Sequence, residues 1–454
     1  MATSPFWHIQ SSIPGVEWPA VPAPGAGAVL ALLDQFESTQ WLPPARLAEL
    51  QLRQIDGLLR HAWDTCPFYR AHWAGRYDPA RVLTSENFAD LPLLKRRDLQ
   101  QHDREIRSDQ PPTAHGTAGE SITSGSMGAP VRTMKTQLTA LYWTALTLRD
   151  HLWHARDLSA KLAVIRAHLH ESEAASWGAA TRGIVATGPV ATLNSGTLIS
   201  KQIDWLRRHD PVYLLSNASN AVELARSCVI RGIRLPALRE VRTIAEMLSE
   251  EGRALMREAW GVRVTDTYSA EEIGYIALQC PRHEHYHVQS EGVLLELLDE
   301  RGAPCAPGQV GRVVLTDLHN FAMPLVRYEI GDYAEAGEPC ACGRGLPVIR
   351  RIAGRERNML VTASGDRLRP YVGARHLLDI APILQQQYVQ KDYDLIEACF
   401  VAETPFSSEQ EARLRERILS DLPSGMRMQF KYCDHIPRGA GGKYEDFICE
   451  ISPR

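Results

Sequence analysis

The chain alternates between short apolar runs and longer segments with a helical pattern of apolar positions. This pattern predicts helices over residues 44–63, 137–152, 219–231 and 247–260. The apolar runs between them predict strands at residues 162–165, 212–215 and 262–265. Strands and helices in alternation favour an α/β architecture with covered sheets.

The carboxyl-terminal third has a different pattern. Residues 293–298 and 311–316 are apolar runs bounded by turn residues, and we expect them to form paired strands. Past Gly354 the pattern predicts a smaller α+β unit, with strands at 359–362 and 396–401 and a charged helix at 408–422.

We therefore expect two domains. Residues 1–353 would form a large N-terminal domain of several subdomains, and residues 354–454 a small α+β C-terminal domain. The beginning of the chain is rich in Pro, Ala and Gly, which predicts an extended arm over residues 1–40.

Composition excludes several classes of protein. The 454 residues include 50 Lys and Arg against 54 Asp and Glu, a net charge of −4, so nucleic acid and anionic membranes are not expected partners. With 44% hydrophobic and 23% charged residues, the chain is typical of a soluble globular protein. The start of the chain lacks a basic segment followed by an apolar one, so we expect a cytoplasmic protein whose nine cysteines are thiols, metal ligands or core residues.

A loop rich in Ser and Gly, at residues 121–131, is the first candidate for chemistry. Its glycines permit close approach, and its hydroxyl and backbone N–H groups can converge on an anion. The loop lacks the lysine of a Walker motif, and a plain turn is the alternative interpretation.

Four further segments carry suitable polar groups. Tyr268-Ser-Ala-Glu-Glu-Ile-Gly follows the predicted strand ending at residue 266, where open α/β sheets bind ligands, and a Glu there suits Mg²⁺ bound to phosphates. Asp332 follows a glycine and can accept hydrogen bonds from ribose hydroxyls. Arg355 lies in Ile352-Ala-Gly-Arg-Glu-Arg-Asn, and Lys443 ends the glycine-rich segment 437–443. Taken singly, these are also explained as a solvated acidic turn, a turn-capping Asp and a surface Lys.

In this order and at these separations, the five motifs resemble the adenylate-forming superfamily of acyl-CoA synthetases. The closest likeness is to the phenylacetate–coenzyme A ligase branch, including its capsular-polysaccharide-associated relatives. The segment 61–70, His-Ala-Trp-Asp-Thr-Cys-Pro-Phe-Tyr-Arg, and the phrase Leu-Pro-Leu-Leu-Lys at 91–95 are typical of that branch. The resemblance runs from roughly Leu58 to the end of the chain.

This resemblance implies a binding site for the β- and γ-phosphates of ATP. The residues that match it are Thr123, Ser124, Gly125, Ser126 and Gly128. The family's pattern is Thr-Ser-Gly-Thr-Thr-Gly-Lys-Pro, and this chain has Met127 for the second Thr and Ala129 for the Lys. Losing one hydroxyl and one cation is expected to weaken the hold on the phosphates, and Arg132 is a candidate to supply the missing charge.

The resemblance also assigns the other motif residues. It implies that Tyr268 lies beside adenine, that Glu272 binds Mg²⁺, and that Asp332 and Arg355 contact the ribose. Lys443 matches the catalytic lysine that bridges the substrate carboxylate and the α-phosphate, where it offsets the accumulating negative charge.

In the family, the small C-terminal domain rotates between adenylation and thioester formation, so we expect it to be mobile. This chain has Arg357-Asn358 where the family often has Asp-Asp at the hinge, and Arg367 where an Asn is common. These departures affect the second half-reaction more than the first.

A group of cysteines and histidines predicts a structural Zn²⁺ site. Cys280 and the following histidines form one short-spaced group, and Cys340 and Cys342 form another. Relatives in the branch pair a Cys and a downstream His-Val with Cys-x-Cys-Gly-Arg, which selects His287 over the nearby histidines. A cluster of reduced surface thiols is the alternative.

The sequence therefore predicts an AMP-forming carboxylate ligase that uses ATP, Mg²⁺ and coenzyme A, with an aryl acid favoured by the resemblance. One alternative passes the acyl group to an amine, a carrier-protein thiol or another nucleophile. Another is a degenerate adenylate binder without turnover. The expected partners are a small-molecule carboxylic acid and an acyl acceptor, and the chain is compatible with a homodimer.

Overall fold

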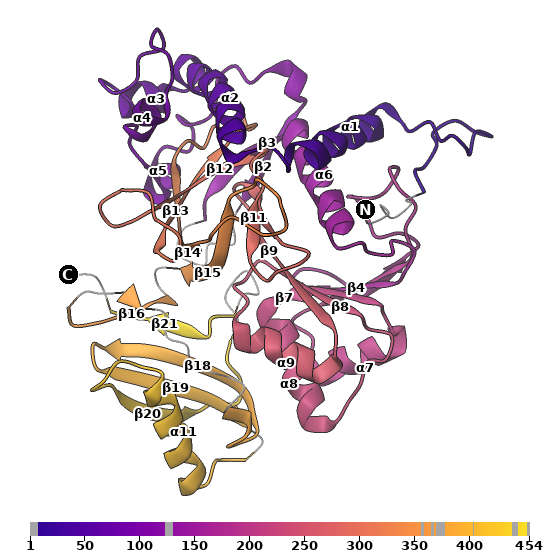
Figure 1. Ribbon diagram of the computed structural model, residues 1–454. Helices are drawn as coiled ribbons and strands as arrows, with labels where there is room; N and C mark the ends of the chain where they lie inside the picture. The colour runs from indigo at the N-terminus through magenta and orange to yellow at the C-terminus, as the bar shows by residue number, and fades with distance from the viewer. Residues whose placement is uncertain are drawn as a thin grey trace. The chain divides into compact units, whose positions relative to one another are not determined.

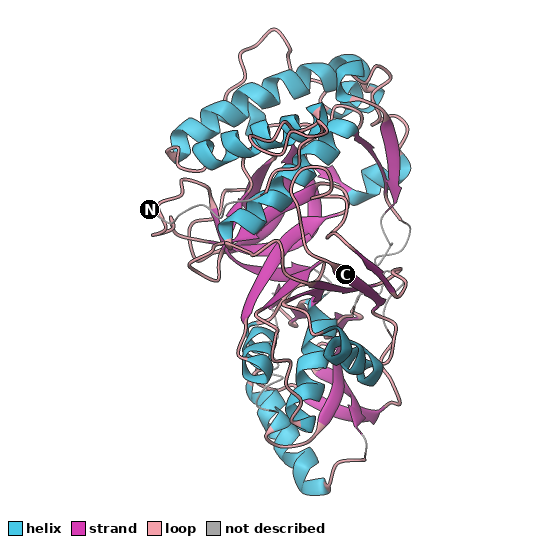
Figure 2. Cartoon of the chain, turned by 90° about the vertical axis from the view of Figure 1, so that its right-hand side faces the viewer, coloured by secondary structure: helices cyan, strands magenta, loops and turns pink. Residues whose placement is uncertain are grey.

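The computed structural model describes residues 8–122, 130–355, 358–364, 367–368, 377–402, 404–437 and 444–451 (Figure 1). The chain divides into two compact units. Unit 1 comprises Met1–Ala160, Ala174–Pro189 and Thr267–Ile352; unit 2 comprises Lys161–Glu173, Val190–Asp266 and Ala353–Arg454. Helices lie beside strands in the fold (Figure 2). Within the described ranges, every helix is too short or too polar to cross a membrane.

The expected extended arm over residues 1–40 is wrong from Pro24 onward, where a helix begins, whereas the described residues 8–23 form no helix. Helix α1 spans Pro24–Thr39, with Pro at its first turn, where a missing N–H costs nothing. The buried positions Ala26, Val29, Leu33 and Phe36 recur three to four residues apart, which is the helical spacing that the Pro, Ala and Gly content obscured.

The remaining helices of unit 1 follow the predicted pattern where that pattern was strong. The predicted helices at 44–63 and 137–152 are confirmed as α2 (Pro44–Thr65) and α6 (Gln137–Trp153). The shorter helices are α3 (Pro67–His72), α4 (Ser85–Ala89) and α5 (Arg96–Gln101). A hairpin of β2 (Ala118–Ile122) and β3 (Arg132–Thr136) flanks the Ser- and Gly-rich loop.

Mostly antiparallel strands form the core sheet of unit 1. In spatial order they run β12, β13, β14, β15, β11, β10 and β9, and the short β1 (Leu94–Lys95) pairs in parallel with β14. Their bounds are β9 Arg263–Ala270, β10 Gly274–Gln279, β11 Tyr286–Val288, β12 Val293–Leu298, β13 Val310–Asp317, β14 Tyr328–Ala336 and β15 Val348–Arg355. The expected pairing of 293–298 with 311–316 is confirmed as β12 against β13.

The middle segments of unit 2 form a parallel sheet in the order β8, β7, β4, β6. These strands and their helices are β4 Leu162–Arg166, β6 Val190–Asn194, α7 Ile199–His209, β7 Tyr213–Asn217, α8 Ala218–Arg231, β8 Glu240–Ile244 and α9 Glu250–Trp260. The short β5 spans Ser172–Ala174. Apolar faces of α7, α8 and α9 pack with the strands around a core that includes Ile165, Leu214 and Val241. Four predicted elements are thus confirmed here within a few residues of their bounds: β4, β7, α8 and α9.

The carboxyl-terminal segment of unit 2 has its own sheet, in the order β20, β19, β18, β21, with α11 packed on it through Leu414 and Ile418. The bounds are β18 Ile383–Asp392, β19 Leu395–Ala402, α11 Ser408–Ser420, β20 Arg427–Tyr432 and β21 Phe447–Cys449. A smaller pair is formed by β16 (Leu360–Val361) and β17 (Arg367–Leu368). Helix α11 starts at a capping box, in which Ser407 and Gln410 bond each other's backbone N–H groups.

The predicted domain boundary lies close to a division between the units. Unit 2 resumes at Ala353, one residue before the predicted start of the C-terminal domain, but it also contains the parallel sheet of the middle segments. The division into residues 1–353 and 354–454 therefore stays a prediction.

Candidate active site

Tyr268 and Asp332 meet in the core of unit 1. The Tyr268 hydroxyl donates to Oδ2 of Asp332 at 2.8 Å, and both residues are buried. The strand that was predicted to end at residue 266 is longer in the structure. It is β9, which continues to Ala270 because its pairing with β10 extends through Tyr268 opposite Ala277. Tyr268 therefore projects from a strand, and its bond to Asp332 joins two residues that the sequence assigned to one nucleotide.

A bulge in β14 explains how Asp332 reaches this position. Between Arg312 and Val314 of β13, the paired residues on β14 step from Tyr333 to Glu329, so β14 holds two extra residues there. Gly331 within this bulge has φ +86°, a conformation that side chains with a Cβ rarely adopt. Bulges of this kind re-aim side chains next to active sites.

Glu272 lies in the turn between β9 and β10. Its Oε1 is 3.3 Å from Nη1 of Arg96, the first residue of α5, and the Glu272 side chain is 8% exposed. Burial raises the pKa of the nearby Tyr328 hydroxyl well above its usual range; Glu272 adds to this effect and Arg96 opposes it. Sequence reasoning missed Arg96, although it directly follows the phrase at 91–95 that carried part of the resemblance.

The neighbouring Glu271, which the sequence left without a role, contacts the hairpin that flanks the Ser- and Gly-rich loop. Its Oε1 accepts a hydrogen bond from Ser121 Oγ at 2.5 Å and lies 3.6 Å from Lys135 Nζ. Because Ser121 is on β2 and Lys135 is on β3, this one carboxylate joins both strands of the hairpin to the Glu272 turn.

Arg132 has a partner of its own. Its Nη1 lies 3.2 Å from Glu120 Oε2, and Glu120 Oε1 accepts from Arg107 at 2.9 Å. The side chain of Arg132 is 55% exposed, so its charge is shared with Glu120 at the surface of the hairpin. The expectation that Arg132 replaces the missing loop lysine stays a prediction.

Several predicted residues fall outside the described residues. These are Thr123, Ser124, Gly125, Ser126, Met127, Gly128, Ala129, Arg357 and Lys443, together with the side chain of Arg367. Arg355, the last residue of β15, is half-buried. At the predicted hinge, Asn358 Nδ2 donates to the carbonyl of Phe447 at 2.6 Å, which ties it to β21.

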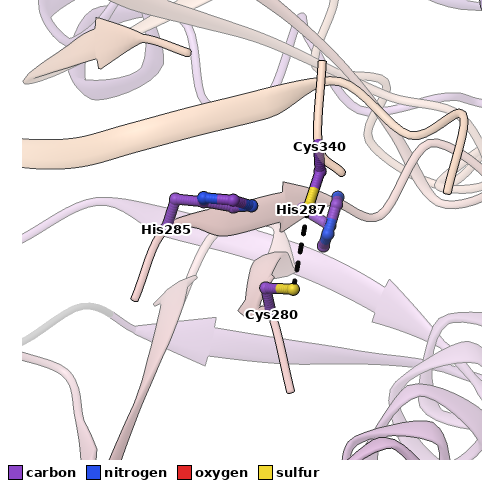
Figure 3. A group of neighbouring side chains, drawn as sticks. All are labelled: Cys280, His285, His287 and Cys340. Carbon is purple, nitrogen blue, oxygen red and sulfur yellow. Dashed lines mark hydrogen bonds between the residues drawn. The ribbon is translucent and has the colours of Figure 1, made fainter. Parts of the chain in front are cut away.

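The cysteines and histidines come together at the β10–β11 hairpin. Ligand atoms of Cys280, His285, His287 and Cys340 all lie within 4.8 Å of one another. The thiols of Cys280 and Cys340 face each other at 3.9 Å, with the imidazole rings of His285 and His287 to either side (Figure 3). His285, which the sequence analysis passed over, therefore belongs to the group.

The chemistry of this group suits a metal. His285 Nε2 and His287 Nδ1 are buried without a hydrogen-bond partner among the described residues. Burial lowers the pKa of His287 to about 3, so its ring is neutral near pH 7 and a nitrogen lone pair is available. Burial also raises the pKa of the Cys340 thiol, whereas a bound cation favours the thiolate.

Cys342 lies beside this group. Its Sγ is 3.4 Å from Nε2 of His287 and 3.6 Å from Nη1 of Arg344. Burial acts to raise the pKa of Cys342, but hydrogen bonds from the backbone and side chain of Arg344 lower it below the usual value.

The Cys340–Arg344 segment is also attached to the start of the chain. The Arg344 guanidinium lies over the rings of Trp41 and Trp153, at 4.9 Å and 4.4 Å, and its Nε donates to Gln40 Oε1 at 2.7 Å. Gly345 N–H donates to the Gln40 carbonyl at 2.9 Å, and a Cβ at Gly345 would lie 1.8 Å from the carbonyl oxygen of Leu42, so only glycine fits.

Comparison with known proteins gives consistent matches. Residues 361–450 match the family model described as the CapK C-terminal domain. The phenylacetate–coenzyme A ligase of Thermus thermophilus is 27% identical over 445 residues, covering 88% of this chain and 96% of the relative. The enzyme of the same name from Pseudomonas putida is 26% identical, covering 73% and 75%.

Among solved structures, the chain is similar to 2-hydroxyisobutyryl-CoA ligase in the postadenylation state in complex with R3-HIB-AMP. The TM-score is 0.72 and the identity 18%, with 91% of both chains covered. The predicted fold class, a large α/β domain with covered sheets and a small α+β C-terminal domain, is confirmed by this match. The resemblance to the phenylacetate–coenzyme A ligase branch is confirmed by the curated relatives.

Proposed function

Because the chain is a homologue of the phenylacetate–coenzyme A ligases in the adenylate-forming superfamily, we propose that it activates a carboxylic acid with ATP and transfers the acyl group to coenzyme A. The observation that supports this most directly is the bond between Tyr268 and Asp332, with Glu272 in the turn that follows the strand of Tyr268. The names of the curated relatives favour an aryl acid as the substrate.

The reaction has two steps. A carboxylate oxygen of the acid attacks the α-phosphorus of ATP, the bond to the β-phosphate oxygen breaks, and pyrophosphate leaves with the electron pair. The sulfur of coenzyme A then attacks the acyl carbonyl carbon, the bond from that carbon to the AMP oxygen breaks, and AMP and the thiol proton are released as the thioester forms. We assign the adenine to Tyr268, the ribose hydroxyls to Asp332 and Arg355, and the charge developing at the α-phosphate to Lys443.

We place Mg²⁺ at Glu272, and the residues fit that ion. Mg²⁺ prefers oxygen ligands and is usually held by one or two carboxylates together with substrate phosphates. Glu272 supplies a buried carboxylate that already forms an ion pair with the Arg96 guanidinium. When bound, Mg²⁺ supplies charge neutralisation for the phosphates of ATP.

The test of this function is pyrophosphate release from ATP and Mg²⁺ across aryl and aliphatic acids, each with and without coenzyme A. We expect acid-dependent pyrophosphate release, with AMP and an acyl-CoA formed in equal amounts when coenzyme A is present. Pyrophosphate without acyl-CoA would redirect the second step to an amine or a carrier-protein thiol. Absence of pyrophosphate with every acid, from protein that also fails to bind ATP, would contradict the proposal.

We further propose that the cysteine and histidine group binds a structural Zn²⁺. Cys280, Cys340 and His287 supply three ligands, and the fourth is either His285, whose ring nitrogen is buried without a hydrogen-bond partner among the described residues, or Cys342, which lies 3.4 Å from His287. Four ligands of these types close a tetrahedral shell, so the role is structural and not catalytic.

Metal analysis of protein purified without a metal-affinity step is expected to find about one Zn²⁺ per chain. Cys280→Ser should lose the metal and lower the unfolding temperature, because a structural Zn²⁺ contributes directly to folding stability. The matched control is Cys305→Ser, a half-buried thiol outside the group, which should retain the metal.

The fourth ligand is identified by two single variants, His285→Ala and Cys342→Ser. Only the change that removes a true ligand should weaken retention of Zn²⁺ against a chelator. Metal-free protein in all preparations, with an unfolding temperature that chelators leave unchanged, would show that the group is a set of reduced thiols.

A further inference from the structure

The guanidinium of Arg96 is held next to Glu272 by the surrounding fold. Strand β1 pairs with β14 in the register Leu94 opposite Tyr328, so α5 begins beside the start of β14. Leu94 and Leu99 are fully buried on either side of Arg96. The backbone N–H of Lys95 donates to Asp98 Oδ2 at 2.8 Å, which closes the first turn of the helix.

The side chain is directed inward, unlike that of its neighbour. Arg96 is 22% exposed and pairs with Glu272, whereas the side chain of Arg97 is 72% exposed and lies 3.8 Å from Asp98 on its own helix. Water screens a largely buried ion pair less than it screens a surface pair. The buried pair therefore fixes the position of its two charges more firmly.

Arg96 differs from the other cations near this site in the partner it uses. Arg132 pairs with Glu120, and Lys135 lies beside Glu271. Arg96 alone among these three pairs with the carboxylate that we assign to Mg²⁺. A guanidinium has five N–H donors, so Arg96 can keep its contact with Glu272 and still donate to an anion next to that carboxylate.

We propose that Arg96 binds the triphosphate of ATP, and that its pairing with Glu272 holds it in place before the nucleotide arrives. A guanidinium offers several N–H donors in one plane and bonds phosphate oxygens in pairs. Arg96 thereby supplies a cation in a chain that has Ala129 where the resemblance places a lysine. This inference rests on the proposed use of ATP.

The test compares the binding of ATP and AMP by calorimetry, in buffer without added Mg²⁺ and with Mg²⁺ present. Arg96→Met should weaken ATP binding by ~10-fold or more, the range for a lost hydrogen bond to a charged group. AMP lacks the β- and γ-phosphates, so its affinity should stay within about twofold. Arg96→Lys should restore part of the ATP affinity, since it retains the charge but not the planar set of donors.

Arg97→Met is the matched control, and it should bind both nucleotides like the unmodified chain. Equal weakening of ATP and AMP binding in Arg96→Met would show that Arg96 supports the structure of the site without contacting the triphosphate. Unchanged ATP binding in Arg96→Met would also overturn the inference and leave the proposed function standing. If the unmodified chain binds neither nucleotide, the proposed function fails with it.

Discussion

Lys443→Ala is expected to slow acid-dependent pyrophosphate release by ~10²–10³-fold, the loss typical of removing one group that stabilises charge in a transition state. The resemblance places this ammonium between the substrate carboxylate and the α-phosphate, two anions that must approach each other. Without it, this repulsion between the carboxylate and the α-phosphate is less well offset. Pyrophosphate release at saturating ATP and acid measures the effect.

The fold should be unaffected, because the neighbouring positions 439–442 are Gly, Ala, Gly and Gly, which have little side chain to pack. The matched control is Lys431→Ala on β20, where the side chain is 56% exposed and lies 3.7 Å from Glu397. A surface pair of this kind contributes at most ~1 kcal/mol, so the control should retain its rate. Wild-type pyrophosphate release by Lys443→Ala would remove this lysine from the mechanism.

Glu272→Gln is expected to lower kcat/KM for ATP by ~10²-fold, because a metal ion stabilises the transition state by several kcal/mol. The substitution keeps the shape of the side chain and removes only its charge. It therefore weakens the proposed Mg²⁺ ligand and leaves Arg96 without its carboxylate. The Mg²⁺ concentration that gives half-maximal rate should rise in the same variant.

Glu271→Gln provides the comparison, since it makes the same change one residue away on a side chain that is 58% exposed. Its carboxylate bonds Ser121 and lies near Lys135, so we expect less than ~10-fold loss, consistent with a weakened charged hydrogen bond. The opposite order of effects would show that the metal-binding carboxylate is Glu271. Unfolding temperatures of the two variants separate these effects from loss of structure.

The sequence predicted the elements that have a strong apolar pattern and missed those that depend on pairing or composition. Helices α2 and α6 and the β12–β13 pair were predicted almost to their ends because a clear apolar pattern runs along each of them. The helix from Pro24 to Thr39 was missed because its Pro, Ala and Gly content indicates extended chain, whereas its burial against the rest of unit 1 favours a helix.

At the candidate site, the motifs identified residues but not their contacts. Tyr268 and Asp332 are 64 positions apart, and their hydrogen bond depends on the bulge in β14, which leaves no local signal except Gly331. Arg96 is even farther from Glu272 along the sequence. It begins α5, whose position is set by the two-residue parallel pairing of β1 with β14. His285 was passed over because a choice among nearby histidines depends on the register of the β10–β11 hairpin.

The attachment of Arg344 and Gly345 to residues 40–42 bears on the order in which the chain folds during synthesis. Helix α1 packs with residues near both Leu278 and Leu346, so its apolar face lacks part of its partner surface until some 300 further residues have left the ribosome. Loop closure over such a separation is slow compared with helix formation. Part of the apolar face of α1 is therefore exposed to chaperones and proteases on the nascent chain, and chains terminated before Cys340 would keep that part open.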